Sequence, residues 1–273
     1  MSENKYKMLV VDIDGTLIGE KKVISKRDKE ALKEAEARGV KVSLCTGRVN
    51  GACRKIIGEL ELDGYHIFYD GALIADPSGE KELYAKEIDK EIVKKMVEFT
   101  RIDDTYLELY SSKQFFAERQ NWSDDIHNRF FEMVPRIMSY DGIWERERII
   151  KAELVVRSKE EELQAERFKK ELARDLRFSI ARSPSFPEIE FINIVSPGVS
   201  KGKALAVLAE YFRVSLEEVM AIGDGSNDIP LLEAAGFSVA MANARDELKE
   251  IADYITLDAD SGGVAAAIEK FLL

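Results

Sequence analysis

The sequence predicts an α/β protein in which a doubly wound parallel sheet is interrupted by an inserted α+β domain. Strand and helix patterns alternate from residue 8 to residue 72, and they alternate again from residue 200 to the end. The strands of both stretches are largely continuous apolar runs, which is typical of parallel strands buried on both faces. Between the stretches, over about residues 87–186, helices and strands follow one another without a polar motif at each strand end.

The first expected strand, Met8–Val11, runs directly into an acidic turn that contains Asp12 and Asp14. In open α/β sheets, ligands bind in the crevice beyond the carboxyl ends of the strands. Because side chains alternate along a strand, both carboxylates are expected to point to the same side, with Ile13 directed into the core. Two carboxylates this close repel each other, and a divalent cation or a shared proton relieves the repulsion. Taken alone, the stretch is equally consistent with an ordinary Asx-type turn.

A second unit repeats this arrangement. Ser25 is suited to cap a helix that ends at Gly39, and residues 40–45 form the next expected strand. Cys45 ends that strand and is expected to be a packed residue rather than a reactive thiol, because cysteine is among the most buried residue types. Polar residues follow the strand directly: Thr46, Gly47 and Arg48.

The third unit consists of a helix over about residues 51–60 and a strand over residues 65–69. His66 lies within that strand and is interpreted as a strand residue rather than a metal ligand. The strand ends at Asp70, which we expect to be a turn residue that faces solvent, because Asp and Gly favour turns. Three consecutive units of this kind predict a Rossmann-like sheet with right-handed crossovers.

The pattern changes after the third unit, and the change defines the expected domain boundaries. A hairpin over about residues 73–85 leads into a region of alternating helices and strands that is rich in aromatic residues. Pro184 and Pro187 are interpreted as the linker that returns the chain to the first domain. The expected domains are a discontinuous core of residues 1–85 and 191–273, and an inserted α+β domain of residues 86–190.

The doubly wound pattern resumes after the insertion. Ser200 can cap a helix over residues 201–212 that begins with Lys201, and residues 219–222 form a buried strand. That strand ends in a further polar turn, and later strand and helix patterns complete the core. The polar members of this turn are Asp224, Asn227 and Asp228.

Length and composition are those of an ordinary globular protein, and they exclude several functions. The 273 residues are 45% hydrophobic and 33% charged. A formal net charge of −11 argues against a general surface for nucleic acid or anionic membranes. The two cysteines, Cys45 and Cys53, provide neither a disulfide framework nor a zinc cluster. With no apolar signal core at the start and no apolar run of membrane length, we expect a reduced, cytoplasmic setting.

The strand ends and one helix start bring a chemically coherent set of side chains to one edge of the predicted sheet. Four carboxylates, one hydroxyl and one cation are expected there. Oxygen ligands with room for water suit Mg²⁺. Zinc is disfavoured, because His66 and His127 are far apart in the sequence and no cysteines stand at ligand spacing. The members of the set are Asp12, Asp14, Thr46, Lys201, Asp224 and Asp228.

Four motifs in this chain resemble those of the haloacid dehalogenase-like phosphatase superfamily, in the family's order. They are Asp12-x-Asp14-Gly-Thr-Leu, Thr46-Gly47-Arg48, Gly198-Val-Ser-Lys201-Gly and Gly223-Asp224-Gly-x-Asn227-Asp228. Thr46 and Lys201 are 155 positions apart, too far for one strand–helix–strand unit, so the insertion falls between the second and third motifs. The chain looks like the Cof-type subfamily, in which an α+β cap selects the substrate.

The resemblance implies a Mg²⁺-dependent phosphoric monoester hydrolase and a role for each motif residue. Asp12 would be the nucleophile that forms an aspartyl-phosphate, and Asp14 would be the general acid and then the base. Lys201 would neutralise charge on the phosphoryl oxygens. The implied substrate-binding residues are Thr46, Gly47, Arg48, Lys201 and Asn227, and the implied metal ligands are Asp12, Asp14, Asp224 and Asp228.

The resemblance leaves the substrate and several alternatives open. The expected partner is a small phosphorylated metabolite such as a sugar phosphate, with flavin-pathway phosphates and phosphoglycolate as alternatives. A phosphomutase would use the same aspartyl-phosphate but return the phosphoryl group to a sugar, and an inactive sensor would only bind the phosphometabolite. A dehalogenase is disfavoured, because a halide leaving group needs no acid at Asp14. We expect a monomer or weak homodimer. Asp70 departs from the Asn that the family often has there, which weakens the inference at this position.

Overall fold

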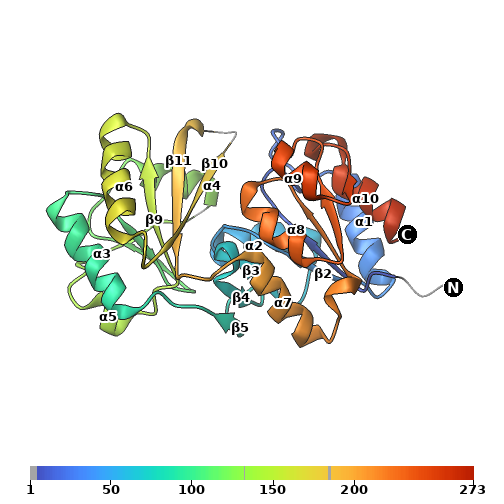
Figure 1. The fold of residues 1–273 in the computed structure, drawn as a ribbon, viewed down its shortest axis with the longest axis horizontal. Coiled ribbons are helices and arrows are strands. Elements are labelled where there is room, and N and C mark those ends of the chain that lie inside the picture. The colour runs from blue at the N-terminus through green and yellow to red at the C-terminus, as the bar shows by residue number, and fades with distance from the viewer. Residues whose placement is uncertain (1–4, 132, 184–185) are drawn as a thin grey trace.

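The computed structural model describes residues 5–131, 133–183 and 186–273, and the chain forms two lobes (Figure 1). The first and last described residues lie in one lobe, which contains the parallel sheet. The middle of the chain forms the other lobe. The chain therefore crosses between the lobes twice, and we call the two lobes the core and the cap.

The core contains a five-stranded sheet in which every neighbouring pair of strands is parallel. Its order is β14 (Tyr254–Ile255), β13 (Phe237–Ala240), β12 (Val219–Gly223), β1 (Met8–Val11) and β2 (Lys41–Leu44). All four residues of β1 are apolar and buried, as expected for a strand covered on both faces. The predicted α/β fold with a doubly wound parallel sheet is confirmed.

Helices connect these strands. They are α1 (Lys26–Ala37), α2 (Asn50–Leu60), α7 (Lys201–Phe212), α8 (Ile229–Ala234), α9 (Asp246–Ile251) and α10 (Gly263–Phe271). From β1 the sheet grows toward β2, and from β12 it grows in the opposite direction, so right-handed crossovers place the connecting helices on opposite faces. On these faces α1 packs against α10, and α7 packs against α8.

The third predicted strand does not extend the parallel ladder. β3 (His66–Phe68) touches β2 through one parallel bridge, between Cys45 and Ile67, and otherwise pairs with β4 (Leu73–Ala75) in an antiparallel hairpin. β5 (Glu82–Ala85) completes this small sheet. The chain reverses after β3 because Tyr69 and Asp70 both adopt a left-handed backbone with φ of 54°, a conformation that propensity alone does not predict.

The cap is built on a six-stranded sheet with α3 (Lys90–Ile102) and α6 (Lys159–Leu172) on the side away from the core (Figure 1). Its strands in spatial order are β10 (Arg177–Ser183), β11 (Phe186–Val195), β9 (Lys151–Val156), β6 (Glu108–Tyr110), β7 (Phe115–Ala117) and β8 (Arg136–Ile137). The short helices are α4 (Ser123–Phe131) and α5 (Ile143–Arg146). Within the described ranges, no helix combines the length and the apolar character needed to cross a bilayer.

The cap sheet continues past the boundary expected at residue 190. β11 pairs with β10 on one side and with β9 on the other, up to Val195. Pro187 therefore lies in a strand rather than in a linker, near the strand's beginning, where a missing N–H is tolerated. Pro184 lies outside the described residues. Residues 188–195 are rich in β-branched and aromatic residues, which is a stronger signal for a strand than two prolines are for a linker.

Candidate active site

The carboxyl end of β1 and the start of α7 bring Asp12 and Lys201 into direct contact. The ammonium of Lys201 lies 2.6 Å from Asp12 Oδ1 and 2.6 Å from Asp228 Oδ1. Only 1% of Lys201 is exposed, so its two carboxylate partners compensate for burial of the charge. Burial opposes the charge on Lys201, but Asp12 and Asp228 outweigh burial and raise the pKa of the ammonium. Lys203, two positions further, is exposed.

Asp228 also holds the turn that follows β12. Its Oδ2 accepts hydrogen bonds from the backbone N–H groups of Asp224, at 3.1 Å, and Gly225, at 2.9 Å. A Cβ at Gly223 would lie 2.7 Å from the side chain of Asp228, so the strand must end in glycine for the carboxylate to fold back. One aspartate therefore fixes both the lysine and the backbone of the turn.

Two residues to which the sequence assigned no role, Thr16 and Asn243, support the turn after β1. The hydroxyl of Thr16 donates to Asp224 Oδ1 at 2.9 Å, which ties the two acidic turns together. The amide of Asn243 donates to the carbonyl of Gly15 at 2.7 Å, and its Oδ1 accepts from the backbone N–H of Ala259 at 3.0 Å. Thr16 is the threonine of the first motif, but its contact with Asp224, like that of Asn243 with Gly15, depends on which loops meet in space.

Three carboxylates of the core gather closely enough to share one cation. Asp12, Asp224 and Asp228 each contribute an oxygen within 4.8 Å of the others, and Lys201 supplies one positive charge against them. Burial, followed by repulsion from Asp228, raises the pKa of Asp12 well above its usual range. The same two causes raise the pKa of Asp224 to about 7. An excess of buried negative charge among oxygen ligands fits a divalent cation.

Asp14 lies at the exposed rim of the site and pairs with Arg48. The two Asp14 oxygens accept hydrogen bonds from Nε of Arg48 at 2.7 Å and from Nη2 at 2.5 Å. The Asp14 side chain is 52% exposed, and that of Arg48 is 19% exposed. Burial disfavours the charge on Arg48, yet Asp14 outweighs it and raises the pKa of the guanidinium. The pair brings the first and second motifs together.

The turn after β2 is organised by Thr46. Its buried hydroxyl oxygen accepts a hydrogen bond from the backbone N–H of Arg48 at 3.0 Å, and its carbonyl accepts from the backbone N–H of Asp70 at 3.1 Å. A Cβ at Gly47 would lie 3.0 Å from Asp70 Oδ1, so a larger residue would crowd that carboxylate. The second motif is thus packed against the turn that follows β3.

The prediction that Asp70 faces solvent is wrong. Asp70 is 7% exposed, and its Oδ1 accepts a hydrogen bond from the amide of Asn227 at 2.9 Å. Its Oδ2 accepts from the hydroxyl of Ser179, in β10 of the cap, at 3.0 Å. Asp70 therefore connects a motif residue of the core to the cap. The sequence hides this role because Ser179 lies 109 positions away, although an acid at a strand end was an available signal.

Cys45 and His66 are packed residues, as expected. Cys45 is fully buried directly before Thr46, and burial raises the pKa of its thiol well above the ordinary value. His66 accepts a hydrogen bond at Nδ1 from the backbone N–H of Leu44 at 3.1 Å. Burial lowers the pKa of His66 to about 4. These environments disfavour a nucleophilic thiolate and a charged imidazole.

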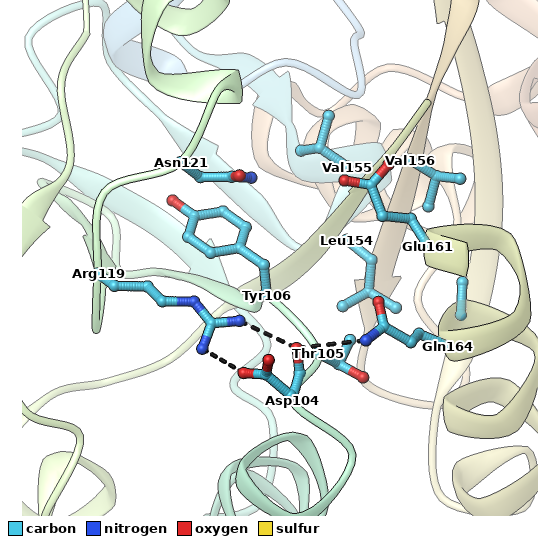
Figure 2. A pocket seen from close by; sticks show the side chains of 11 residues that line it. Asp104, Thr105, Tyr106, Arg119, Asn121, Leu154, Val155, Val156, Glu161 and Gln164 are labelled. Atoms are coloured by element: carbon cyan, nitrogen blue, oxygen red, sulfur yellow. Dashed lines mark hydrogen bonds and ion pairs between the residues drawn. The ribbon is translucent and has the colours of Figure 1, made fainter. Parts of the chain in front are cut away.

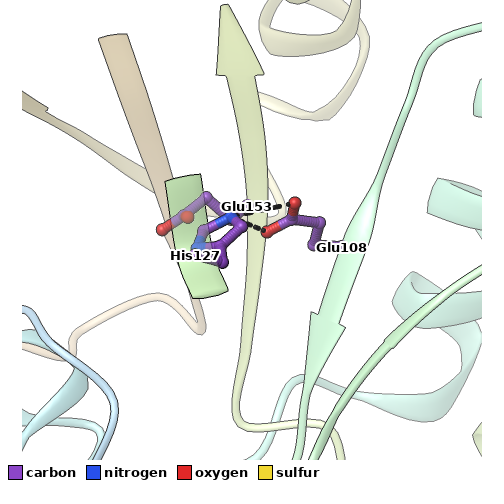
Figure 3. A group of neighbouring side chains, drawn as sticks. All are labelled: Glu108, His127 and Glu153. Atoms are coloured by element: carbon purple, nitrogen blue, oxygen red, sulfur yellow. Dashed lines mark hydrogen bonds and ion pairs between the residues drawn. The ribbon is translucent and has the colours of Figure 1, made fainter. Parts of the chain in front are cut away.

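A second buried cluster lies in the cap (Figure 3). Glu108, His127 and Glu153 each present an atom within 4.8 Å of the others, and His127 Nε2 lies 3.0 Å from Glu108 Oε2. Burial disfavours a charged His127, but Glu108 outweighs it and raises the pKa of the imidazole. Lys151 forms an ion pair with Glu153. Two carboxylates thus face two cationic partners, so the cluster needs no metal ion for charge balance.

A polar hollow of about 110 Å³ lies beside α6 in the cap (Figure 2). Arg119 borders it and donates to the Asp104 carboxylate at 2.5 Å and to the Asp104 carbonyl at 2.9 Å. Gln164 donates to the same carbonyl at 3.3 Å. The residues that line the hollow include no member of the four motifs, so it is separate from the candidate active site.

The family follows from comparison with known proteins. The model of the haloacid dehalogenase-like hydrolase family matches residues 9–268. The chain therefore belongs to the haloacid dehalogenase-like hydrolases, and the resemblance drawn from the four motifs is confirmed.

Several relatives that align with nearly the whole chain are named phosphatases. The chain is 31% identical to the putative phosphatase YxeH of Bacillus subtilis (strain 168), over 98% of this chain and 99% of that protein. It is 30% identical to the 5-amino-6-(5-phospho-D-ribitylamino)uracil phosphatase YcsE of the same organism, over 98% of this chain and 96% of that protein. The structure of the HAD subclass IIB sugar phosphatase BT4131 is 27% identical, with a TM-score of 0.81 over 97% of this chain and 98% of that chain. The protein is a phosphoric monoester hydrolase for small phosphorylated substrates.

Proposed function

We propose that this protein is a Mg²⁺-dependent phosphatase that hydrolyses small phosphorylated metabolites through an aspartyl-phosphate on Asp12. The observation that carries the proposal is the buried contact of Lys201 with Asp12 and Asp228, at 2.6 Å each. A fixed ammonium beside a buried carboxylate reduces the repulsion that an anionic nucleophile meets at an anionic phosphate. The named phosphatases among the relatives support the same reaction class.

Asp12 would attack phosphorus with one carboxylate oxygen, and the bond from phosphorus to the leaving oxygen would break. Water would then attack the acyl phosphate, release inorganic phosphate and restore the Asp12 carboxylate. Lys201 would stabilise the phosphoryl oxygens in both steps. Because the Thr46 hydroxyl already accepts a hydrogen bond from the Arg48 backbone, its own proton is available for a phosphate oxygen.

Asp12, Asp224 and the backbone carbonyl of Asp14 would hold the Mg²⁺. Asp228 belongs to the same acidic group, but its carboxylate accepts hydrogen bonds from Lys201 and from two backbone N–H groups. We therefore assign Asp228 to orienting Lys201 and the turn rather than to direct ligation. When bound, the metal ion offsets the charge between the nucleophile and the phosphate and thereby lowers the barrier to attack.

Asp14 would protonate the leaving oxygen and would then take a proton from the attacking water. Its two contacts with Arg48 hold its carboxylate in one orientation in the absence of substrate. Delivery of a proton requires Asp14 to give up at least one of these contacts. The guanidinium donors released in this way, together with Gly47 and Asn227, would then face the substrate phosphate.

The names of the relatives include one sugar phosphatase and one phosphatase of a ribityl compound, so a sugar or polyol phosphate is the chemistry they share. We propose this class as the substrate, with phosphoglycolate as an alternative. A phosphomutase remains the competing reaction, since it would use the same nucleophile. Measuring phosphate release with and without a sugar bisphosphate separates the two, because a mutase requires the bisphosphate and releases little phosphate.

Metal dependence is tested by phosphate release from a panel of phosphorylated metabolites before and after chelation. We expect activity to disappear with chelation and to return with Mg²⁺. Asp224→Asn should raise the Mg²⁺ concentration needed for half-maximal activity, because it removes a charged ligand. Asp246→Asn, at an exposed carboxylate, is the control. Full activity after exhaustive chelation would refute the metal, and no release from any ester would refute the phosphatase.

A further inference from the structure

The buried carboxylate of Asp70 lies between the second motif and the fourth. Its backbone N–H donates to the carbonyl of Thr46 at 3.1 Å, and its Oδ1 would lie 3.0 Å from a Cβ at Gly47. The same oxygen accepts a hydrogen bond from the amide of Asn227 at 2.9 Å. Asp70 therefore lies against three residues that the proposed function places at the substrate phosphate, although it belongs to none of the four motifs.

The second oxygen of this carboxylate is bound by the cap. Oδ2 accepts a hydrogen bond from the hydroxyl of Ser179 in β10 at 3.0 Å. Ser179 is the register partner of Asn193 in β11, and paired residues of antiparallel strands project to the same face. Ile192 and Ile194, on either side of Asn193, belong to the hydrophobic cluster that the sheet forms with α3 and α6. Ser179 therefore projects from the polar face of the cap sheet toward the core.

The backbone fixes the position of the carboxylate. Tyr69 and Asp70 both have φ of 54°, a left-handed conformation that is uncommon outside glycine and persists only where surrounding contacts hold it. The hydroxyl of Tyr69 donates to the carbonyl of Ser111 in the cap at 2.9 Å, so both residues of this turn reach the cap. Asp70 is thus a fixed acceptor whose two oxygens point to different lobes.

Asn227 is the partner through which Asp70 can affect the site. Its half-buried side chain lies in the short turn Ser226–Asp228 after β12. An amide nitrogen carries two hydrogens, of which one is donated to Asp70 and the other is available to a phosphate oxygen. A carboxylate and a phosphate are both acceptors, and an amide nitrogen can donate to both at once. Holding this side chain in advance reduces the conformational entropy lost when phosphate binds.

Building on the proposed function, we propose that Asp70 is a positioning residue, which orients the amide of Asn227 toward the substrate phosphate and links this orientation to the contact of Ser179 with the core. Asp70 does not itself touch the phosphate. Moving the cap away from the core would break the contact with Ser179 and leave Asp70 with one side-chain partner. The amide of Asn227 is therefore held most firmly when the cap lies on the core.

The test compares two uncharged variants, Asp70→Asn and Asp70→Ala, by the dissociation constant of inorganic phosphate, measured by calorimetry in the presence of Mg²⁺. Asparagine retains an oxygen that accepts from Asn227, and alanine does not, so the pair isolates this contact from the charge. We expect Asp70→Ala to bind phosphate about three- to tenfold more weakly than Asp70→Asn, because one side chain is no longer held. When Asn227→Ala is added to both variants, the difference should disappear.

Two further variants complete the design. Ser179→Ala should weaken phosphate binding by about twofold or more, and only when Asn227 is present. Asp28→Ala is the matched control for loss of a buried carboxylate. Asp28 is 1% exposed and accepts hydrogen bonds from the hydroxyl of Ser25 at 2.6 Å and the backbone N–H of Ala265 at 2.7 Å. Its loss should lower the melting temperature and leave phosphate binding unchanged.

The outcomes separate this proposal from the proposed function. Equal phosphate affinity of Asp70→Asn and Asp70→Ala would overturn it, and so would a difference that persists when Asn227→Ala is added. No change in Ser179→Ala would overturn the link to the cap. Wild type that binds phosphate but hydrolyses no ester would instead overturn the proposed function. If Asp70→Ala fails to fold, Asp70→Ser takes its place, because its shorter side chain does not reach Asn227.

Discussion

Asp12 and Asp14 are separated by one residue and have different surroundings. Asp12 is buried against Lys201, where burial and Asp228 raise its pKa, while half of the Asp14 side chain is exposed beside Arg48. Two carboxylates in unlike environments can divide the work of nucleophile and acid–base catalyst. The division assigned here makes a prediction for each of them.

Asp14→Asn should slow the first chemical step in proportion to how poor the leaving group is. A sugar alkoxide needs a proton as it departs, whereas p-nitrophenolate barely does, and general acid catalysis is typically worth about 10²–10⁴-fold. We expect a rapid-quench burst to slow strongly with a sugar phosphate and little with p-nitrophenyl phosphate. Equal slowing with both substrates would mean that Asp14 acts through the metal or the fold.

His66 makes a separate prediction about stability. Its Nε2 is buried without a hydrogen-bond partner among the described residues, and its pKa is about 4 instead of the ordinary 6.5. Between pH 6.5 and pH 4 the unfolded chain binds a proton at His66 that the folded chain refuses, so the free energy of unfolding falls as the pH falls. The full effect is on the order of 3 kcal/mol.

His66→Asn isolates this contribution, because an amide oxygen can still accept the hydrogen bond from Leu44 but does not titrate. Denaturant unfolding of both proteins from pH 7 to pH 4 provides the comparison. We expect the wild type to lose more free energy of unfolding than the variant as the pH drops. A difference between the two proteins that stays constant over this range would show that His66 titrates normally.

The sequence predicted most members of the candidate site because strand ends in α/β sheets converge. Asp12, Thr46 and Asp224 were predicted because each lies just after an apolar strand pattern. Asp70 obeyed the same rule, but its substitution for the family's Asn and the turn propensity of Asp-Gly argued for solvent. Its burial depends on Ser179, a residue of the inserted domain, and no local pattern reports that contact.

At the scale of the elements, the position of Lys201 depends on how α7 begins. Ser200 caps the helix by accepting a hydrogen bond from the backbone N–H of Lys203. Gly71 packs directly against this N-terminal residue of α7. It has φ of 102°, and a Cβ at Gly71 would clash with the carbonyl oxygen of Ser200. The start of α7 therefore keeps its position only if the turn after β3 has a glycine at residue 71.

Gly71→Ala should for this reason reduce both stability and activity. The strained backbone alone costs about 1–3 kcal/mol, and the clash displaces Ser200 and with it the lysine. Gly39→Ala is the matched control, because Gly39 has φ of 87° with no atom within 4 Å of the added Cβ. We expect both variants to melt earlier and only Gly71→Ala to lose kcat/KM. Equal kcat/KM in the two variants would contradict this account of the helix start.

Element prediction failed where long-range pairing overrode local pattern. β3 pairs with β4 in an antiparallel hairpin because the chain turns back at Tyr69 and Asp70, although the apolar sequence of β3 is typical of a parallel strand. β11 was obscured by Pro187, yet pairing on both sides with β9 and β10 stabilises it as a strand. In both cases the deciding partner was a neighbouring strand, which a single segment does not reveal.

At the scale of the whole molecule, the two lobes contribute different residues around the candidate active site. The core supplies the acids and the lysine, and the cap lies over them through the contact of Ser179 with Asp70. The motif spacing located the insertion correctly between Thr46 and Lys201. The composition of the cap could not reveal which face of its sheet is polar, because that requires the strand register.

Trapping the covalent intermediate tests the central claim most directly. Acid quenching during turnover of a phosphate ester, followed by peptide mapping, should find a phosphoryl group on Asp12, because acyl phosphates survive acid better than base. Asp12→Asn, folded as judged by its melting curve, should show neither the adduct nor turnover, since it lacks the nucleophile. An adduct on another residue, or substantial turnover by Asp12→Asn, would contradict the assignment of Asp12 as the nucleophile.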